Sequence, residues 1–336
     1  MNLPDRIRDK RGEFLLFAIT PPRKATPPER VAQIADRTLS RLEALPVDGV
    51  VLYDIDDESG RNGSERPFPF LPVIDPADYL SGYLSTLGAP AIVYRAVGKY
   101  SRAEIAAWAG SQDPQKVLSV FVGSPTKRQG PHASLTDAHL MRSETAPELV
   151  VGGVAIPERH TRRGDEHLRM LSKQEAGCSF FVTQVVYDVT AAKNLISDYH
   201  YWCSSTGAAP VPIVFTFSVV GGNRTLEFMR WLGVDVPRWV ENELTHSANP
   251  LLASHEHSLA SAKEILSYCR RLGVPVGLNV ESVSRRLVEI EQSFALAHDL
   301  EKLLHREADA ADEIRPRSIR EDLRERATLA SSGATA

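Results

Sequence analysis

Two polar residues, Gln184 and Glu281, occupy positions where they could take part in binding or catalysis. Gln184 lies within the charge-free run 176–187, AGCSFFVTQVVY. An amide in such a run is costly to bury unless it is hydrogen-bonded. Its planar donor and acceptor suit a ligand with an amide-like edge, such as a pterin or a pyrimidine. A hydrogen bond between two strands in the core is the structural alternative.

Glu281 follows the apolar run GLNV at 277–280. A carboxyl group there could donate a proton if burial raised its pKa. It could equally pair with Arg285, which lies one helical turn further along the chain. The sequence therefore supports a catalytic acid and a structural ion pair to the same degree.

The histidines and cysteines form no established metal-binding or nucleophile motif. There is no HExxH and no GxSxG, and the alternating HEH at 255–257 lacks the four-residue spacing by which two helical ligands converge. His160, next to Arg159, is better suited to contact an anion or a ring. We predict no metal site.

Short apolar runs alternate with longer amphipathic ones, which is typical of parallel strands joined by helices. Strands are predicted at 14–20, 49–55, 91–97, 117–123, 149–157, 179–187, 212–218 and 276–281. These runs are apolar on both faces, as parallel strands in a covered sheet are. Helical patterns lie between them, and the segments 236–243 and 254–272 look like an insertion before the last strand.

Eight strand and helix units predict the α/β class and a (β/α)8 TIM barrel. A doubly wound open sheet is the alternative, but FAITPPR at 17–23 stands where its GxGxxG would follow the first strand. In a barrel, chemistry gathers where the strands end, so Asp54, Gln184 and Glu281 would lie on one rim. Asp54 could also simply cap the next helix. We expect one barrel domain at 1–305 and a polar tail at 306–336.

The composition excludes several classes of function. The 336 residues include 39 Lys and Arg against 43 Asp and Glu, which lacks the basic excess of a nucleic-acid-binding protein. The three cysteines are odd in number and have no zinc spacing, which favours a reducing compartment. The longest charge-free stretch, 199–223, is interrupted by Pro210 and Pro212 and does not make an apolar span of about 20 residues. We expect a cytoplasmic protein that binds neither nucleic acid nor membrane.

Several motifs in order resemble those of the methylenetetrahydrofolate reductase family. VAIPERH at 154–160 is followed by AG at 176–177 and FFVTQVVYD at 180–188, at the spacing of that family. FAITPPR at 17–23 is similar to the family's opening motif, and 211–218 with 228–240 resemble its seventh strand and the segment that follows. The resemblance covers roughly residues 14–289.

The resemblance implies a barrel oxidoreductase that binds FAD and passes a hydride from NAD(P)H to 5,10-methylenetetrahydrofolate, giving 5-methyltetrahydrofolate. It assigns the pterin edge to Gln184 and further substrate contacts to Ser124 and Phe217. The cofactor positions that it implies are Tyr53, Tyr94, Gly123, His160 and Lys173. The partners expected from it are a folate substrate and, among proteins, a homo-oligomer or an enzyme of one-carbon metabolism.

The sequence departs from the family pattern at the chemistry itself. Ala18 stands at the position of the family's acidic glutamate, and a methyl group cannot donate a proton. Val122-Gly123-Ser124 replaces an Arg-Gly-Asp, which removes a bidentate anion partner. Ile156 and Tyr94 differ as well. These departures make FAD doubtful.

Three functions are therefore compatible with the sequence. The first is a reductase in which NAD(P)H delivers hydride directly and Glu281 or Asp54 supplies the acid. The second is a different folate-linked one-carbon transfer or a demethylation. The third is a folate-binding pseudoenzyme or partner protein.

Overall fold

Eight parallel strands close into a barrel in the computed structural model, which describes residues 1–57, 64–123 and 132–313. Each strand pairs with the next in the sequence, and β8 pairs with β1, as the (β/α)8 prediction requires. The strands are β1 (Phe14–Ile19), β2 (Gly49–Leu52), β3 (Ala91–Ala96), β4 (Val117–Val122), β5 (Val151–Ala155), β6 (Cys178–Val185), β7 (Ile213–Ser218) and β8 (Val276–Glu281).

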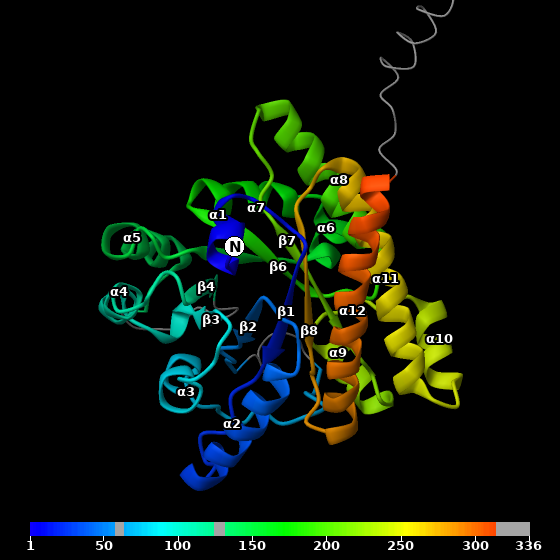
Figure 1. Cartoon of the computed structure of the whole chain (residues 1–336), viewed down its shortest axis with the longest axis horizontal. Helices are drawn as coiled ribbons and strands as arrows, with labels where there is room; N and C mark the ends of the chain where they lie inside the picture. Colours follow the sequence, from blue (N-terminus) through cyan, green and yellow to red (C-terminus); the bar gives the residue numbers. More distant parts are fainter. Residues whose placement is uncertain (58–63, 124–131, 314–336) are drawn as a thin grey trace, which may run out of the picture. The chain divides into compact units, whose positions relative to one another are not determined.

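Helices surround the strands (Figure 1). They are α1 (Leu3–Arg8), α2 (Pro28–Glu43), α3 (Pro76–Tyr83), α4 (Arg102–Gly110), α5 (Leu135–Thr145), α6 (Pro157–Arg163), α7 (Glu166–Glu175), α8 (Val189–Thr206), α9 (Asn223–Trp231), α10 (Arg238–His246), α11 (Pro250–Leu272) and α12 (Leu287–Glu313), with a 3₁₀ turn η1 (Val97–Lys99). The predicted insertion before the last strand corresponds to α10 and α11. None of the helices in the described ranges is long and apolar enough to cross a lipid bilayer.

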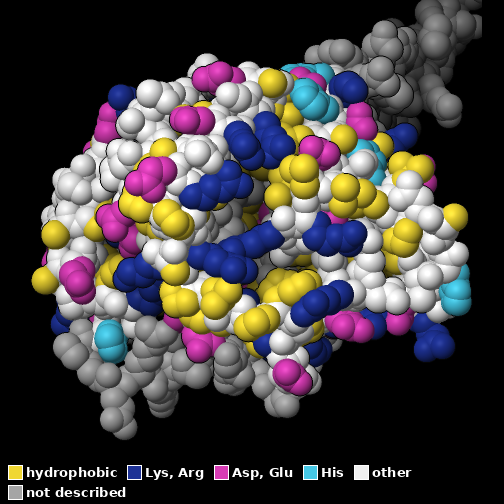
Figure 2. Space-filling view, turned by 90° about the horizontal axis from the view of Figure 1, so that it is seen from below, with side chains coloured by type: hydrophobic (Ala, Val, Ile, Leu, Met, Phe, Trp, Pro, Cys, Tyr) yellow, Lys and Arg dark blue, Asp and Glu magenta, His cyan; other side chains and the backbone are white. Residues whose placement is uncertain are grey.

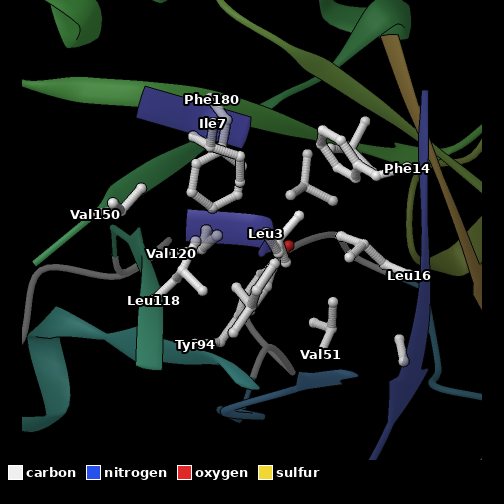
Figure 3. Packing of buried hydrophobic residues seen from close by; sticks show 14 residues of the cluster. Leu3, Ile7, Phe14, Leu16, Val51, Tyr94, Leu118, Val120, Val150 and Phe180 are labelled. Carbon is white, nitrogen blue, oxygen red and sulfur yellow. The ribbon is translucent and has the colours of Figure 1, made fainter. Parts of the chain in front are cut away.

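The interior of the barrel is filled by hydrophobic side chains from alternate positions of the strands (Figure 3). Two glycines make room for the largest of them. A Cβ atom on Gly277 would lie 2.5 Å from the ring of Phe14, and one on Gly152 would lie 2.6 Å from the ring of Phe180. The two phenylalanines therefore fill space that glycine leaves open on a neighbouring strand.

The short helix α1 lies at the amino ends of the strands. Leu3 and Ile7 are fully buried and belong to the same hydrophobic cluster as the interior of the barrel. The side chain of Asn2 accepts a hydrogen bond from the backbone N–H of Asp5 and so caps the helix. The apolar face of α1 closes this end of the barrel.

Residues 1–301 form one compact unit, and residues 302–336 form another. Helix α12 continues from the first unit to Glu313. The rest of the predicted tail, from 314 onward, lies outside the described residues, and the extent of the tail stays a prediction.

Candidate functional site

A large cavity lies at the carboxyl ends of the strands, where the chemistry of this fold gathers. Its volume is about 1140 Å³, which exceeds the usual range of about 300–1,000 Å³ for a site that holds one small molecule. Figure 2 looks from below onto this face and shows Lys and Arg side chains together with hydrophobic ones around a hollow. The basic residues that line the cavity are Arg66, Arg159, Arg169 and Lys173.

Gln184 lines the cavity from the end of β6. Its Nε2 donates a hydrogen bond of 3.0 Å to the carbonyl oxygen of Leu232, at the end of α9. The amide is therefore held by a helix terminus and takes no part in a bond between strands. This contact fixes the plane of the amide and leaves its carbonyl oxygen without a hydrogen bond among the described residues.

Glu281 lines the same cavity from the end of β8. Burial raises the pKa of its carboxyl group to about 7, although a hydrogen bond with Tyr53 opposes this shift. Among the described residues it forms no ion pair, so the predicted pairing with Arg285 is not seen. A carboxyl group with this pKa can carry a proton near neutral pH and release it.

A hydrogen-bonded network positions Tyr53, the hydrogen-bond partner of Glu281. The side-chain N–H groups of Asn279 donate to the hydroxyl oxygens of Tyr53, at 3.3 Å, and of Thr216, at 3.2 Å. Burial and the nearby Glu281 raise the pKa of Tyr53, which keeps the phenol protonated. The ring of Tyr53 packs edge-on against that of Tyr94 with their centroids 4.8 Å apart. Tyr53 therefore offers Glu281 a fixed, protonated hydroxyl.

The register of the barrel places Glu281 beside Ala18. These two residues are directly paired across β1 and β8. Both belong to the rows of side chains that face inward, since Ala18 is part of the interior cluster and Glu281 lines the cavity. Ala18 on β1 has no carboxyl group, but Glu281 provides one at the paired position of the adjacent strand β8.

Asp54 lines the same cavity, as the sequence predicts, and its carboxylate is engaged by several donors. Its side chain is fully buried and forms an ion pair with Lys99. It also accepts hydrogen bonds from the backbone N–H of Ala96, at 2.9 Å, and from the hydroxyl of Tyr100, at 2.8 Å. The carboxylate therefore anchors the segment that follows β3, and a catalytic role for Asp54 stays a prediction.

The two further substrate contacts are not found at the site. Phe217 is fully buried on β7, between Thr216 and Ser218. Because side chains alternate along a strand and Thr216 faces inward to Asn279, Phe217 points outward into the layer between the strands and the helices. The prediction for Phe217 is therefore corrected. Ser124 lies outside the described residues.

Four of the five predicted cofactor positions line the cavity: Tyr53, Tyr94, Gly123 and Lys173. Lys173 donates a hydrogen bond to the backbone carbonyl of Val154, and burial lowers the pKa of its ammonium group. His160 does not line the cavity. Its Nε2 lies 3.0 Å from a carboxylate oxygen of Asp198 on α8, so the prediction of a cofactor contact is corrected for this residue.

Sequence reasoning placed Lys173 of α7 at the site but missed the other residues of α7 and the contribution of α9 to the cavity wall. Arg169 and Ser172 come from α7, whereas Phe228 and Leu232 come from α9 and its end. Spacings of three and four residues place the members of each pair on one helix face, which is the signal that the sequence contained. Two helices, α6 and α7, follow β5 in succession, and both contribute side chains to the cavity wall.

A second buried carboxyl group, Glu158 on α6, lies away from the cavity lining. It is 2 % exposed, and its Oε2 has no hydrogen-bond partner among the described residues. Burial raises its pKa to about 7, and the charge of Asp235 adds to the effect. Glu158 and Glu281 thus have similar acidity, but only Glu281 faces the cavity.

The fold and the cavity define a (β/α)8-barrel protein with a ligand-sized site at the carboxyl ends of its strands. The chain is 39% identical to an uncharacterized protein from Clostridium thermocellum that binds two copies of 5-methyl-5,6,7,8-tetrahydrofolic acid. The match covers 90% of this chain and 99% of that protein, with a TM-score of 0.80. The chain belongs to the same family as this tetrahydrofolate-binding barrel.

Other comparisons add little. No model of a protein family and no curated protein matches the sequence. A psychrophilic glycoside hydrolase family 10 endo-beta-1,4-xylanase, at 10% identity, and a 2,3-dimethylmalate lyase, at 12% identity, have TM-scores of only 0.45 and 0.40. They cover 87% and 92% of this chain, and 93% and 97% of their own, but carry no functional argument.

Proposed function

We propose that this protein binds a reduced folate in the cavity at the mouth of its barrel, with the pterin edge against Gln184. The observation that carries the proposal is the bound 5-methyltetrahydrofolic acid of the relative that is 39% identical over nearly all of its length. The cavity supports it in two ways. Gln184 presents an oriented amide, and Arg66 supplies positive charge for the carboxylates of a folate tail.

We further propose that Glu281 is the acid of a reductase reaction at this site. Glu281 donates a proton to N10 of 5,10-methylenetetrahydrofolate, so that the bond between N10 and the methylene carbon breaks and the carbon stays bonded to N5. NAD(P)H, when bound, supplies a hydride to the carbon, which becomes the methyl group of 5-methyltetrahydrofolate. Two observations support this role: Glu281 stands next to Ala18 in the barrel, and its pKa of about 7 allows proton donation near neutral pH.

FAD does not fit the described residues well enough to enter the reaction. Of the positions that the family resemblance assigns to the flavin, His160 is turned toward Asp198 and Lys173 is hydrogen-bonded to the backbone of Val154. Tyr94 is packed on Tyr53 and is only 7% exposed. We therefore propose direct use of NAD(P)H, with Arg159 and Arg169 as the residues that would hold its phosphates.

A second candidate function is a one-carbon transfer or demethylation that begins from the methylated folate, or binding without catalysis. The observation that favours it is that the relative binds the 5-methyl form, which is the product of the reductase reaction. In that case Glu281 would protonate the pterin nitrogen as the methyl group leaves. This function predicts transfer or loss of the methyl group without oxidation of NAD(P)H.

Folate binding is tested by titration calorimetry with 5-methyltetrahydrofolate. We expect saturable binding to the wild-type protein and an affinity at least tenfold lower for Gln184→Ala, because a buried polar contact to the ligand is lost. Gln33→Ala is the matched control, since Gln33 lies on α2 and bonds only to Arg30. Absence of binding to the wild type, or equal affinity of the two variants, would refute the proposal.

The reductase reaction is tested by following NAD(P)H oxidation with 5,10-methylenetetrahydrofolate. We expect Glu281→Gln to lower the rate by about 10²–10⁴-fold, the usual contribution of a general acid. The wild-type rate should fall as the pH rises through about 7, because Glu281 loses its proton. A protein that binds the folate but oxidises no NAD(P)H would exclude the reductase and leave the second candidate.

A further inference from the structure

Three side chains from consecutive helices meet on the outer side of α6. They are His160 on α6, His167 on α7 and Asp198 on α8. One potential ligand atom of each lies within 4.8 Å of those of the other two. The two imidazole rings are perpendicular, with their centroids 5.3 Å apart. The cluster is separate from the cavity at the carboxyl ends of the strands, where we propose that folate binds, because none of the three residues lines that cavity.

The internal contacts of the cluster leave two ring nitrogens unused. Nε2 of His160 lies 3.0 Å from Oδ2 of Asp198. Nδ1 of His160 and Nδ1 of His167 are buried and have no hydrogen-bond partner among the described residues. His160 is only 5% exposed. Since buried polar atoms in folded proteins are nearly always paired, two such atoms in one cluster point to a missing ligand.

The chemistry of the cluster suits a cation and does not suit an anion. Two imidazole rings and one carboxylate are a donor set that transition-metal ions prefer. The nearby Arg159 and Arg169 line the cavity and do not belong to the cluster. Asp198 adds a carboxylate whose side chain is 54% exposed, which gives an ion a path from solvent.

We propose that His160, His167 and Asp198 bind one divalent transition-metal ion of the Zn²⁺ type. Two ligand atoms at 2.0–2.1 Å from a tetrahedral zinc lie about 3.3 Å from each other. The potential ligand atoms of the cluster lie within 4.8 Å of one another, so their separations need to shrink by up to about 1.5 Å. A rotation of the exposed Asp198 side chain and of His167 provides that movement. Three protein ligands leave the fourth position to water.

The metal ion would join three helices, of which α6 and α7 are already linked by the ion pair between Arg159 and Glu166. Helices α6 and α7 carry Arg159, Arg169 and Lys173, which line the folate cavity. An ion bound to His160 and His167 therefore stiffens the basic wall of the cavity from behind without touching the ligand. His160 and His167 are seven residues apart on different helices, and Asp198 follows 31 residues later. These spacings match no metal-binding motif, which is why the sequence predicted no metal site.

The test uses the full-length protein, freed of metal by a chelator, and Zn²⁺ alone as the probe. We expect titration calorimetry to show one Zn²⁺ per chain, and Co²⁺ to give the visible absorption of a tetrahedral site. Asp198→Asn and His167→Ala should each weaken Zn²⁺ binding at least tenfold, because each removes a ligand. His200→Ala is the matched control, since this histidine lies on α8 and packs edge-on against Tyr201 outside the cluster.

Thermal unfolding supplies a second readout. Zn²⁺ should raise the melting temperature of the wild type and of His200→Ala but not of Asp198→Asn, because only a site that exists in the folded state stabilises it. Asp198→Asn changes an exposed side chain, so the variant folds. No Zn²⁺ binding to the wild type would overturn the proposal, and so would binding that survives in both ligand variants. Neither result depends on whether the protein binds folate.

Discussion

The acidity of Glu281 makes a quantitative prediction about how the stability of the protein depends on pH. Its carboxyl group has a pKa of about 7 in the fold, against an ordinary value of 4.5. Between these two values the folded protein holds a proton that the unfolded chain has lost. The free energy of unfolding therefore falls as the pH rises through this window.

The magnitude follows from the separation of the two pKa values. At 1.36 kcal/mol per pH unit, the full loss that Glu281 causes is about 3 kcal/mol. About 2.5 kcal/mol of it falls between pH 5 and pH 8. Glu281→Gln keeps the shape of the side chain and removes its titration. The variant should thus lose about 2.5 kcal/mol less stability than the wild type when the pH is raised from 5 to 8.

The assay is urea unfolding of both proteins at pH 5, 6, 7 and 8, followed by circular dichroism. Glu158→Gln is the matched control, because Glu158 has a similar pKa but lies outside the cavity lining. Glu158→Gln should flatten the pH dependence of the free energy of unfolding to a similar extent and leave the affinity for folate unchanged. Glu281→Gln should change both the pH dependence and the affinity for folate. If Glu281→Gln and the wild type lose equal stability between pH 5 and pH 8, the pKa of Glu281 is not raised in the folded protein.

Two further variants test Asp54 and Phe217. Asp54→Asn should lower the free energy of unfolding by about 3 kcal/mol in urea titrations, because it leaves Lys99 and the donors of Ala96 and Tyr100 facing a side chain without charge. A loss of folate turnover with unchanged stability would instead support Asp54 as a catalytic acid. Phe217→Ala should destabilise the protein by about 3–5 kcal/mol through an internal cavity. Its affinity for 5-methyltetrahydrofolate, measured under conditions where it is folded, should equal that of the wild type; a weaker affinity would place Phe217 back at the ligand.

The barrel could be predicted from the sequence because its strands are short apolar runs at regular intervals. All eight were placed, although the second was expected to extend to residue 55 and ends at Leu52. The positions of Gln184 and Glu281 could also be predicted, because each follows a buried run and the carboxyl ends of barrel strands share one rim. Hydrophobic periodicity determines both features, and it depends only on local sequence.

The directions of individual side chains were harder to predict. Phe217 stands between Thr216 and Ser218, and the alternation of the strand sends it outward, a signal that the family resemblance overrode. Asp54 and His160 find their partners at Lys99 and Asp198, which lie 45 and 38 residues further along the chain. Such contacts depend on how loops and helices pack around the barrel, and no pattern of spacing encodes them.

The closure that Leu3 and Ile7 form at the amino end determines where a ligand can enter. The packed side chains of the barrel interior separate this end from the cavity (Figure 3). Within the part of the chain that the structure describes, a ligand beside Glu281 therefore enters and leaves through the rim at the carboxyl ends of the strands.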